Sequence, residues 1–520
     1  MKSNLNNFQK TLIKGKGITL IALVITIVIL IILATVTINA VLGENGLISK
    51  AQQAKEIQEQ AIRNEEEGMN TLLGEFAEAM GELPVAPKLS DGMVPVKWNG
   101  SNWVKTTAED KEWYNYGNKQ WANVVLTQTS GEKEGKDATE EVDVFNEDGT
   151  LNEDSAYSML VWIPRYAYQI TSLYHESGEG AGNINIVFID TENKNNAGTK
   201  RYSEIYPSYE TGTGMYGVAE EGCEAGYVVH PAFNFGEEKL AGFWVGKYET
   251  SNTNCTQEAS TGETEYTGNE IITIKAGVTS WRNITVSDIF TACTELNREG
   301  NPYGLKTSDT EVDPHMMKNT EWGAVAYLSQ NTTYGKGSEV WKNNSSDYIT
   351  GNGGNSVNAS PASRVTNEYN TSNGMQASTT GNIWGIYDMS GGASEYVAAY
   401  VNNENSYLTT YGEKLVNANE KYKDVYQATS TSGTDSQLDN YNLSTPIKGK
   451  YGEAVYETSN GYTGSKAWYS DGSNFPYSDK PFFTRGGPYN NISASGLFNL
   501  YIIDGFFNGA GSFRVVLTVM

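Results

Sequence analysis

The sequence predicts an α+β protein in which a long N-terminal helix precedes a small β-hairpin region and a larger, irregular domain. Three observations carry this prediction. Residues 18–42 contain no charged side chain, and residues 47–80 repeat apolar side chains at helical spacing. The rest of the chain alternates short apolar runs with turns that are rich in its 54 glycines. A length of 520 residues allows more than one domain.

The charge and the rare residue types exclude several classes of function. The chain has 62 acidic and 37 basic residues and a net charge of −25, which argues against a nucleic-acid-binding surface. Cys223, Cys255 and Cys293 lack metal-ligand spacing, and the three histidines are scattered. We therefore expect no cysteine or histidine metal site. A disulfide between Cys223 and Cys255 stays open as an alternative to free thiols.

Residues 1–42 predict a single-pass membrane anchor. Residues 1–17 carry four lysines and no acid, and the uncharged run over residues 18–42 exceeds the ~20 residues that cross a bilayer as a helix. Basic residues before the run place the N-terminus inside the cell and the bulk of the chain outside. A secretory signal is disfavoured, because the run is too long and no small-residue cleavage site follows it.

The junction KGITLI, residues 16–21, resembles the processing motif of type IV pilins. In that family a membrane peptidase cleaves after the glycine and methylates the new N-terminus. The resemblance implies a leader of residues 1–17, a cut between Gly17 and Ile18 by a prepilin-type peptidase, and a bacterial cell surface. The family usually has Glu at the fifth mature position, where this chain has Ala22. Because a carboxylate in lipid is costly unless paired, its absence favours a plain anchor over a pilus subunit.

Residues 43–156 predict a spacer and a stalk. Residues 43–82 form a helical spacer with a thin apolar stripe, and residues 83–156 form a small β-rich stalk that ends in an acidic linker. Trp98, Trp103, Trp113 and Trp121 stand among Asn-Gly and Gly-Asn turns, which is typical of β-hairpins. Their uneven spacing favours a hairpin core over a carbohydrate-binding repeat.

Residues 157–520 form the predicted main domain. Buried strands are expected over residues 159–166 and 242–249, and helices over residues 285–296 and 316–330. Residues 329–381 are rich in Asn, Ser, Thr and Gly, which predicts a long surface insertion.

An ordered set of motifs in this domain resembles the formylglycine-generating-enzyme, or sulfatase-modifying-factor, family. The motifs are WVGKYE (244–249), NTEW (319–322), WGIYDMSG (384–391), RGG (485–487) and SFRV (512–515). The resemblance implies a variant of the C-type lectin fold. The enzymes of that family bind copper through cysteines in the C-terminal part, because Cu(I) prefers thiolates. Residues 294–520 contain no cysteine, so we expect the fold without the catalysis.

The same resemblance indicates a candidate site for a structural Ca²⁺ ion at the turn after residues 387–389, since hard oxygen ligands in a glycine-rich turn suit that ion. The matching positions are Gly391, Gly392, Ala393 and Glu395. A turn in which Glu395 is simply solvated is the equal alternative.

The C-terminal segment, residues 485–517, carries a second resemblance, to the variable regions of proteins diversified by retroelements. Arg485-Gly486-Gly487, Gly496-Leu497-Phe498, Gly505 and Ser512-Phe513-Arg514 match the fixed residues of such regions. The resemblance implies that a template is copied back with substitutions at adenines, mostly in Asn codons. The predicted variable positions between the fixed residues are Ile492, Ala494, Ser495, Asn499, Tyr501, Ile502, Ile503, Asp504, Phe506, Phe507, Gly509, Ala510 and Gly511.

The composition of this segment agrees with that mechanism. Substitution at the first two bases of AAC or AAT cannot produce a codon for Glu, Lys, Gln, Met or Trp, and residues 481–519 contain none of these five. A buried core segment is the alternative, but the segment has neither a helical nor a strand period. We expect Leu497, Phe498, Phe513 and Val515 to lie inside. Tyr501, Ile502, Ile503, Phe506 and Phe507 should face outward as an apolar interaction surface.

These observations together predict a membrane-tethered, non-catalytic protein that binds an unidentified protein or cell-surface ligand through a diversified face. No cofactor is expected beyond the calcium considered above. A minor pilin or pseudopilin with a large head is the first alternative, and an oxidase of the formylglycine type is the second.

Overall fold

The computed structural model describes residues 84–127, 144–170, 181–195, 198, 201–204, 223–255, 263–308, 310–363, 366–428, 435–443, 451–491 and 493–520. The chain divides into two compact units, Met1–Asn70 and Thr71–Met520. Only Lys50, Lys55 and Gln58 of the first unit are described. The predicted leader, membrane helix and helical spacer therefore lie outside the described residues. In the described part of the chain, no helix has the length and apolar character needed to cross a bilayer.

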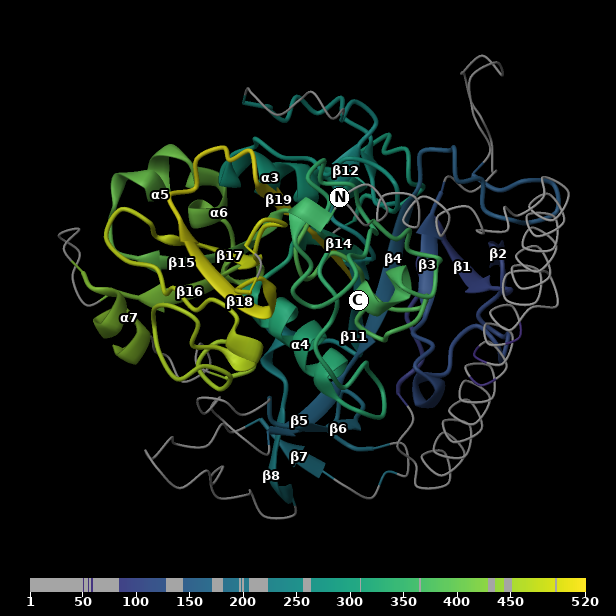
Figure 1. Ribbon diagram of the computed structural model, residues 1–520, viewed down its shortest axis with the longest axis horizontal. Coiled ribbons are helices and arrows are strands. Elements are labelled where there is room, and N and C mark those ends of the chain that lie inside the picture. Colours follow the sequence, from purple (N-terminus) through teal and green to yellow (C-terminus); the bar gives the residue numbers. More distant parts are fainter. Residues whose placement is uncertain are drawn as a thin grey trace, which may run out of the picture. The chain divides into compact units, whose positions relative to one another are not determined.

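The described part of the second unit is mostly β-sheet with a few short helices (Figure 1). The predicted α+β class therefore takes a mainly β form in this part of the chain. Its largest sheet has seven strands in the order β14-β20-β11-β4-β3-β1-β2, all paired antiparallel. These strands are β1 Met93–Trp98, β2 Trp103–Lys105, β3 Asn123–Leu126, β4 Ser158–Pro164, β11 Gly242–Gly246, β14 Val312–Met316 and β20 Val515–Val519.

This sheet crosses the predicted boundary between the stalk and the main domain. Strand β3 pairs with β4 from Asn123↔Val161 to Leu126↔Ser158, so the hairpin region is an extension of the main sheet. All four residues of β3 are buried, and a buried backbone must find hydrogen-bond partners on both edges. Trp103, Trp113 and Trp121 lie in the core, as the hairpin hypothesis predicts.

The predicted helices are present as α3, Val286–Thr294, and α4, Asn319–Gln330. Thr285 caps α3 by accepting a hydrogen bond from the backbone of Asp288, at 3.3 Å. Every residue of α4 is buried. A helix that is enclosed on all sides needs no polar face, which explains the weak amphipathic pattern of this sequence.

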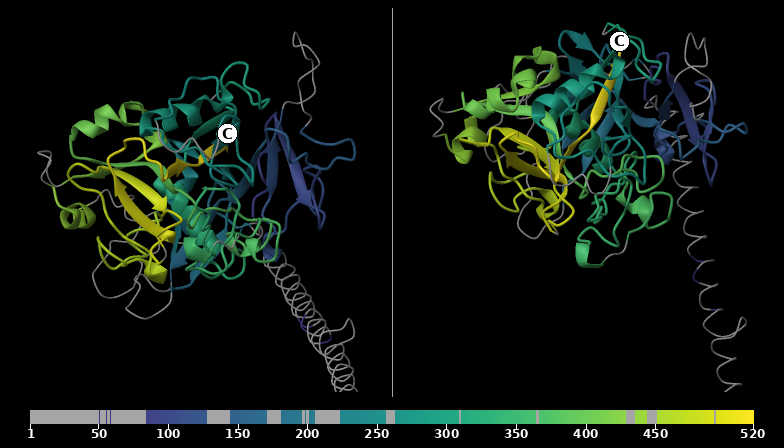
Figure 2. Two further views of the ribbon diagram at one scale, coloured as in Figure 1. Left: turned by 45° about the horizontal axis from the view of Figure 1, so that its top comes forward. Right: turned by 90° about the horizontal axis from the view of Figure 1, so that it is seen from above.

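A second sheet has the order β16-β15-β17-β18, and β19 pairs in parallel with the beginning of β15. These strands are β15 Ser394–Asn402, β16 Asp424–Gln427, β17 Phe482–Gly486, β18 Gly496–Ile503 and β19 Gly511–Phe513. Figure 2 shows the C-terminal segment divided between the two sheets, with β20 running in among the strands of the larger one.

Strand β18 lies in the segment where the sequence shows neither a helical nor a strand period. It pairs antiparallel with β17, from Arg485↔Leu500 to Phe482↔Ile503. Its first five residues are all buried, and only Tyr501–Ile503 reach the surface. Because both faces of its first half are covered, the apolar residues do not alternate, and the sequence shows no period of two.

Residues 329–381 also differ from the prediction, because the described part of this segment contributes to the core and is not a surface insertion. Tyr334, Val340, Tyr369 and Ala377 belong to the core. Their polar neighbours supply hydrogen bonds to the backbone, as where Asn331 Nδ2 donates to Ile184 O at 2.8 Å. A segment with little regular structure can be buried when side-chain amides replace the missing backbone partners.

The remaining elements are short. A four-stranded sheet has the order β6-β5-β8-β7, and two ribbons pair β9 with β10 and β12 with β13. Their bounds are β5 Tyr166–Ile170, β6 Ile184–Phe188, β7 Arg201–Ser203, β8 Cys223–Val229, β9 Asn234–Phe235, β10 Glu238–Lys239, β12 Ser251–Asn252 and β13 Ile272–Thr273. The short α-helices are α5 Ser406–Thr410, α6 Glu413–Asn417 and α7 Gln437–Leu443. The 3₁₀ turns are η1 Tyr116–Asn118, η2 Pro231–Phe233, η3 Glu295–Asn297, η4 Pro361–Ser363, η5 Gly374–Ala377, η6 Glu420–Tyr422 and η8 Trp468–Ser470.

Candidate binding site

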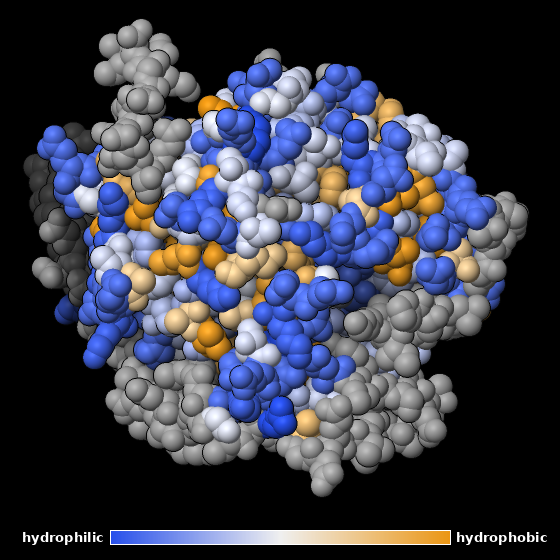
Figure 3. All heavy atoms as spheres, turned by 180° about the vertical axis from the view of Figure 1, so that it is seen from behind, coloured by the Kyte–Doolittle hydropathy of each residue, from blue (hydrophilic) through white to orange (hydrophobic). Residues whose placement is uncertain are grey.

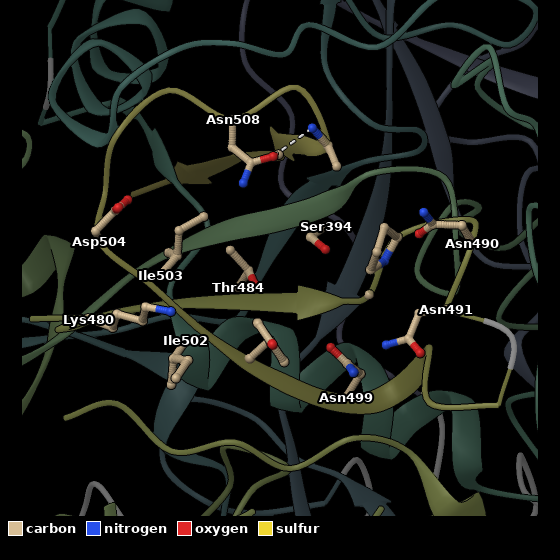
Figure 4. Close-up of a pocket in the computed structure, with 15 residues that line it drawn as sticks. Ser394, Lys480, Thr484, Asn490, Asn491, Asn499, Ile502, Ile503, Asp504 and Asn508 are labelled. Carbon is tan, nitrogen blue, oxygen red and sulfur yellow. Dashed lines mark hydrogen bonds between the residues drawn. The ribbon is translucent and has the colours of Figure 1, made fainter. Parts of the chain in front are cut away.

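A pocket of about 530 Å³ opens beside the exposed end of β18 (Figure 4). It is lined by residues of β15, β17 and β18 and of the loops on either side of β18. Its walls mix amides, hydroxyls and aliphatic groups with one lysine and one aspartate. The lining residues are Ser394, Lys480, Thr484, Gly487, Pro488, Asn490, Asn491, Asn499, Tyr501, Ile502, Ile503, Asp504, Asn508, Ala510 and Gly511.

Seven predicted variable positions line this pocket: Asn499, Tyr501, Ile502, Ile503, Asp504, Ala510 and Gly511. The side chains differ in depth. Tyr501 is 47% exposed, and Asn499 is only 1% exposed. Asn499 Nδ2 donates to Ala494 O at 2.6 Å, while its Oδ1 has no hydrogen-bond partner in the described part of the chain. The segment thus supplies both the floor and part of the rim.

The other predicted variable positions lie outside the pocket lining. Phe506 is 37% exposed, and its ring lies 3.8 Å from that of Phe507 and 5.0 Å from that of Tyr411, between ring centroids. Ala494, Phe507 and Gly509 are half-buried, and Ile492 lies outside the described residues. Figure 3 shows the face opposite to that of Figure 1, where apolar residues form small groups among hydrophilic ones.

Ser495 does not face outward as predicted. It is 2% exposed, and its hydroxyl lies 2.8 Å from Pro488 O and 3.0 Å from Asn491 O. The side chain therefore closes the turn before β18 and is unavailable to a ligand. Gly511 is also buried, because it opens β19 and pairs with Ser394.

The predicted interior anchors are buried. Leu497, Phe498, Phe513 and Val515 all belong to the core. Phe498 packs edge-to-face on Trp468, with 5.1 Å between ring centroids, and its backbone N–H donates to Asp471 Oδ2 at 2.9 Å. These contacts fix the strand on which the exposed residues are carried.

The loop of residues 504–510 is held through its backbone carbonyls. Each donor comes from outside residues 485–517, so none of these bonds depends on a side chain of the loop. Val286 N donates to Gly505 O at 3.3 Å, Tyr396 Oη to Phe506 O at 2.7 Å, Asn283 N to Asn508 O at 3.0 Å, Arg282 Nη1 to Gly509 O, and Ser394 N to Ala510 O at 2.7 Å.

Gly505 is required by the shape of this loop. Its φ of +89° lies in the left-handed region that favours glycine. A Cβ atom at this position would lie 2.5 Å from Cε2 of Phe482. The structure therefore gives a reason for a glycine at this position, which the sequence analysis predicts to be fixed.

Two buried arginines join the C-terminal segment to the rest of the domain. Arg485 donates to Asn319 Oδ1 at 2.8 Å and to the carbonyls of Glu453 and Ala454 at 2.9 Å each. Desolvation lowers the pKa of Arg485 to about 9. Arg514 donates from Nε to Glu395 Oε2 at 2.9 Å and from Nη2 to Glu395 Oε1 at 2.5 Å. The RGG and SFRV motifs thus serve the framework.

The turn proposed for calcium is occupied by internal contacts. Gly392 N donates to Asn343 O at 2.8 Å, and Ala393 N donates to Glu249 Oε1 at 2.8 Å; Gly391 is also buried. Glu395 is not solvated, because both of its oxygens accept bonds from Arg514, and burial raises its pKa. Among the described residues no three Asp, Glu, His or Cys side chains converge to hold a metal. The calcium prediction thus gains no support from this geometry.

The thiols show no sign of joint chemistry. Cys255 and Cys293 are free thiols, so no disulfide joins Cys223 to Cys255. Cys293 is buried on α3, and desolvation raises the pKa of its thiol well above the usual range. A thiol with a raised pKa is a poor nucleophile at neutral pH.

Sequence reasoning missed eight pocket residues. Asn490, Asn491, Asn508, Gly487 and Pro488 lie within residues 485–517, so the segment boundaries already pointed to them. Ser394, Lys480 and Thr484 lie outside it. No local pattern marks them, since only the pairing of β15, β17 and β18 brings them together.

No protein-family model matches the chain, and no curated protein sequence matches it. Two solved structures show a distant likeness. "Treponema denticola variable protein 1" is 10% identical with a TM-score of 0.27, over 70% of this chain and 96% of that one. "Major Tropism Determinant U1 Variant" is 10% identical with a TM-score of 0.23, over 85% of each chain. Likenesses this distant carry no argument about fold or function.

Proposed function

We propose that this protein binds a ligand through the pocket and the adjoining surface of β18 and loop 504–510. The observation that carries the proposal is that seven positions selected from sequence alone line one pocket. Concave sites with apolar walls and a few polar groups are where ligands usually bind. The exposed Tyr501 and Phe506 are aromatic residues, which are enriched at protein interfaces.

In this proposal the main domain is a C-type-lectin-like scaffold, and the positions on its face are diversified. The support is the separation of roles within residues 485–517. Residues that hold the segment point inward, and the loop is bound by its carbonyls. Side chains at the exposed positions can therefore change with little effect on the fold.

We propose that the protein is non-catalytic. The motif order resembles a family of oxidases, yet residues 294–520 contain none of the cysteines that such chemistry needs. The framework arginines and the buried carboxylate of Glu395 are paired with each other or with backbone carbonyls. Stoichiometric copper binding with oxidation of a sulfatase peptide by the full chain would refute this part of the proposal.

The N-terminal part of the proposal is a single-pass anchor in a bacterial cell membrane, with the binding domain outside. It rests on the uncharged residues 18–42 and the Lys16–Gly17–Ile18 junction. Mass analysis of the N-terminus of membrane-extracted protein tests it. A mature chain that begins with a methylated Ile18 is expected, whereas an intact Met1 or a cut near residue 42 would contradict it.

Sequencing tests the diversified face directly. The gene would be amplified from many cells of the source population and the encoded proteins compared. Differences should concentrate at the predicted variable positions on the surface and be absent at Arg485, Gly505 and Arg514. A reverse transcriptase gene and a near-copy of the segment should lie nearby. Differences spread evenly over the chain would refute diversification, and a pilus gene cluster without these features would favour the minor pilin.

A further inference from the structure

Lys480 lies at the edge of the pocket. It is half-buried, and its Nζ makes no ion pair or hydrogen bond within the described residues. Figure 4 shows its ammonium group directed toward the centre of the pocket. The stem of this lysine is partly covered while its charged end stays accessible, an arrangement that lysine side chains commonly adopt.

Two amide donors point into the same space. Asn508 Oδ1 accepts the backbone N–H of Ala510 at 2.7 Å, which leaves its Nδ2 facing the pocket (Figure 4). The amide nitrogen of Asn491 also faces inward in this view. Together with Lys480, these groups offer N–H donors from three sides.

Among the described residues that line the pocket, the only acid is Asp504. Its Oδ1 accepts the backbone N–H of Phe506 at 3.0 Å, so the carboxylate is tied to its own loop. Asp504 and Lys480 do not form an ion pair, and Figure 4 shows the carboxylate turned away from the ammonium group. The charge of Lys480 therefore remains available to a ligand.

We propose that this pocket binds a carboxylate, carried by an acidic side chain of a protein partner, with Lys480 as its counter-ion. A single lysine balances one negative charge, whereas a phosphate would call for further cations. The aliphatic walls of Ile502 and Ile503 suit the methylene stem of such a side chain. Distant acids of the chain oppose binding weakly, because the Debye length is about 8 Å at physiological ionic strength.

This inference deepens the proposed function and rests on it for the use of the pocket. It adds that part of the binding specificity would be the same in every version of residues 485–517. Lys480, Ser394 and Thr484 lie outside residues 485–517, so every version of the segment would keep the same cation and hydroxyls beside it. Variation around them would then select among acidic partners.

The test uses the full chain and two matched probes, N-acetylglutamate α-amide (the glutamate probe) and the uncharged N-acetylglutamine α-amide (the glutamine probe), followed by ligand-observed NMR. The glutamate probe, whose one carboxylate is on the side chain, should bind at least about 10-fold more tightly than the glutamine probe. Lys480→Met should abolish this preference and Lys480→Arg should keep it. Asp504→Asn should tighten binding of the acidic probe, because it removes the nearby negative charge while keeping the loop hydrogen bond. Lys111→Met, at an exposed lysine outside the pocket lining, is the charge-matched control.

Equal binding of the two probes, or a preference that survives Lys480→Met, would overturn the inference. Tighter binding of N-acetylneuraminic acid than of the glutamate probe would overturn the assignment to an acidic side chain. Thermal melts of each variant exclude misfolding as the cause of a loss. The two proposals can fail separately. If probe binding depends on Lys480 but sequencing finds no variation in residues 485–517, this inference stands and diversification is refuted. If sequencing finds the expected variation but probe binding does not depend on Lys480, only this inference is refuted.

Discussion

Phe506 and Phe498 lie eight residues apart and should respond very differently to truncation. Phe498 is 1% exposed and packs on Trp468, so Phe498→Ala removes a fully buried ring and leaves a cavity. Such changes cost about 3–5 kcal/mol of unfolding free energy. Phe506 is 37% exposed and opens to solvent. The substitution Phe506→Ala therefore removes about 60% of a burial free energy of about 3 kcal/mol, and it leaves no closed cavity.

Because the unfolded chain already covers part of this surface, Phe506→Ala should cost about 1–1.5 kcal/mol. This value exceeds the ~0.5 kcal/mol of a fully exposed site, since the ring also contacts Tyr411. Urea unfolding of both variants, followed by tryptophan fluorescence, measures the difference. Equal losses at the two positions would refute the assignment of Phe506 to a replaceable surface and support a core role for the loop.

Three further predictions concern the loop and a buried acid. Gly505→Ala should cost at least about 2 kcal/mol more than Gly464→Ala, because both glycines have φ near +90° and only Gly464 has open space for a Cβ; equal melting temperatures would contradict this. Tyr396→Phe should cost about 1 kcal/mol and speed amide exchange in residues 505–510, because Phe506 O loses its donor; unchanged exchange would show that the bond is dispensable. Burial raises the pKa of Glu457 from 4.5 to about 7, so the folded state binds its proton more tightly than the unfolded state does. The free energy of unfolding should therefore fall as pH rises from about 4.5 through 7. Urea midpoints across this range should show a smaller fall for Glu457→Gln than for the wild type.

The parts of the fold that follow local periodicity could be predicted from the sequence. The strands β4 and β11 and the helices α3 and α4 lie where apolar spacing placed them. Strand β18 was missed because the packing on both of its faces hides the strand period. The boundary after residue 156 was missed because β3 finds its partner across a long acidic segment, and no local signal encodes such pairing.

The residues of the candidate site could also be predicted only in part from the sequence. The segment predicted to be variable could be delimited from the sequence, because its expected fixed residues and its missing amino-acid types are sequence properties. Its exposed and buried members could not be separated, since Ser495 and Asn499 differ from their neighbours only through the turns that they close. Lys480 and Thr484 join the site only because β17 pairs with β18, a tertiary contact.

The position of β20 has a consequence for how new versions of this protein would be screened. The last strand, Val515–Val519, lies between β14 and β11 in the largest sheet, and the segment that carries the proposed recognition face is translated just before it. A frameshift or stop codon within that segment deletes the strand and separates β14 from the rest of the sheet. Such a product loses five buried residues of its core and should be degraded before display. If the segment is diversified as proposed, copying errors that destroy the reading frame would be removed at the folding step, and the versions that reach the surface would be those with an intact frame.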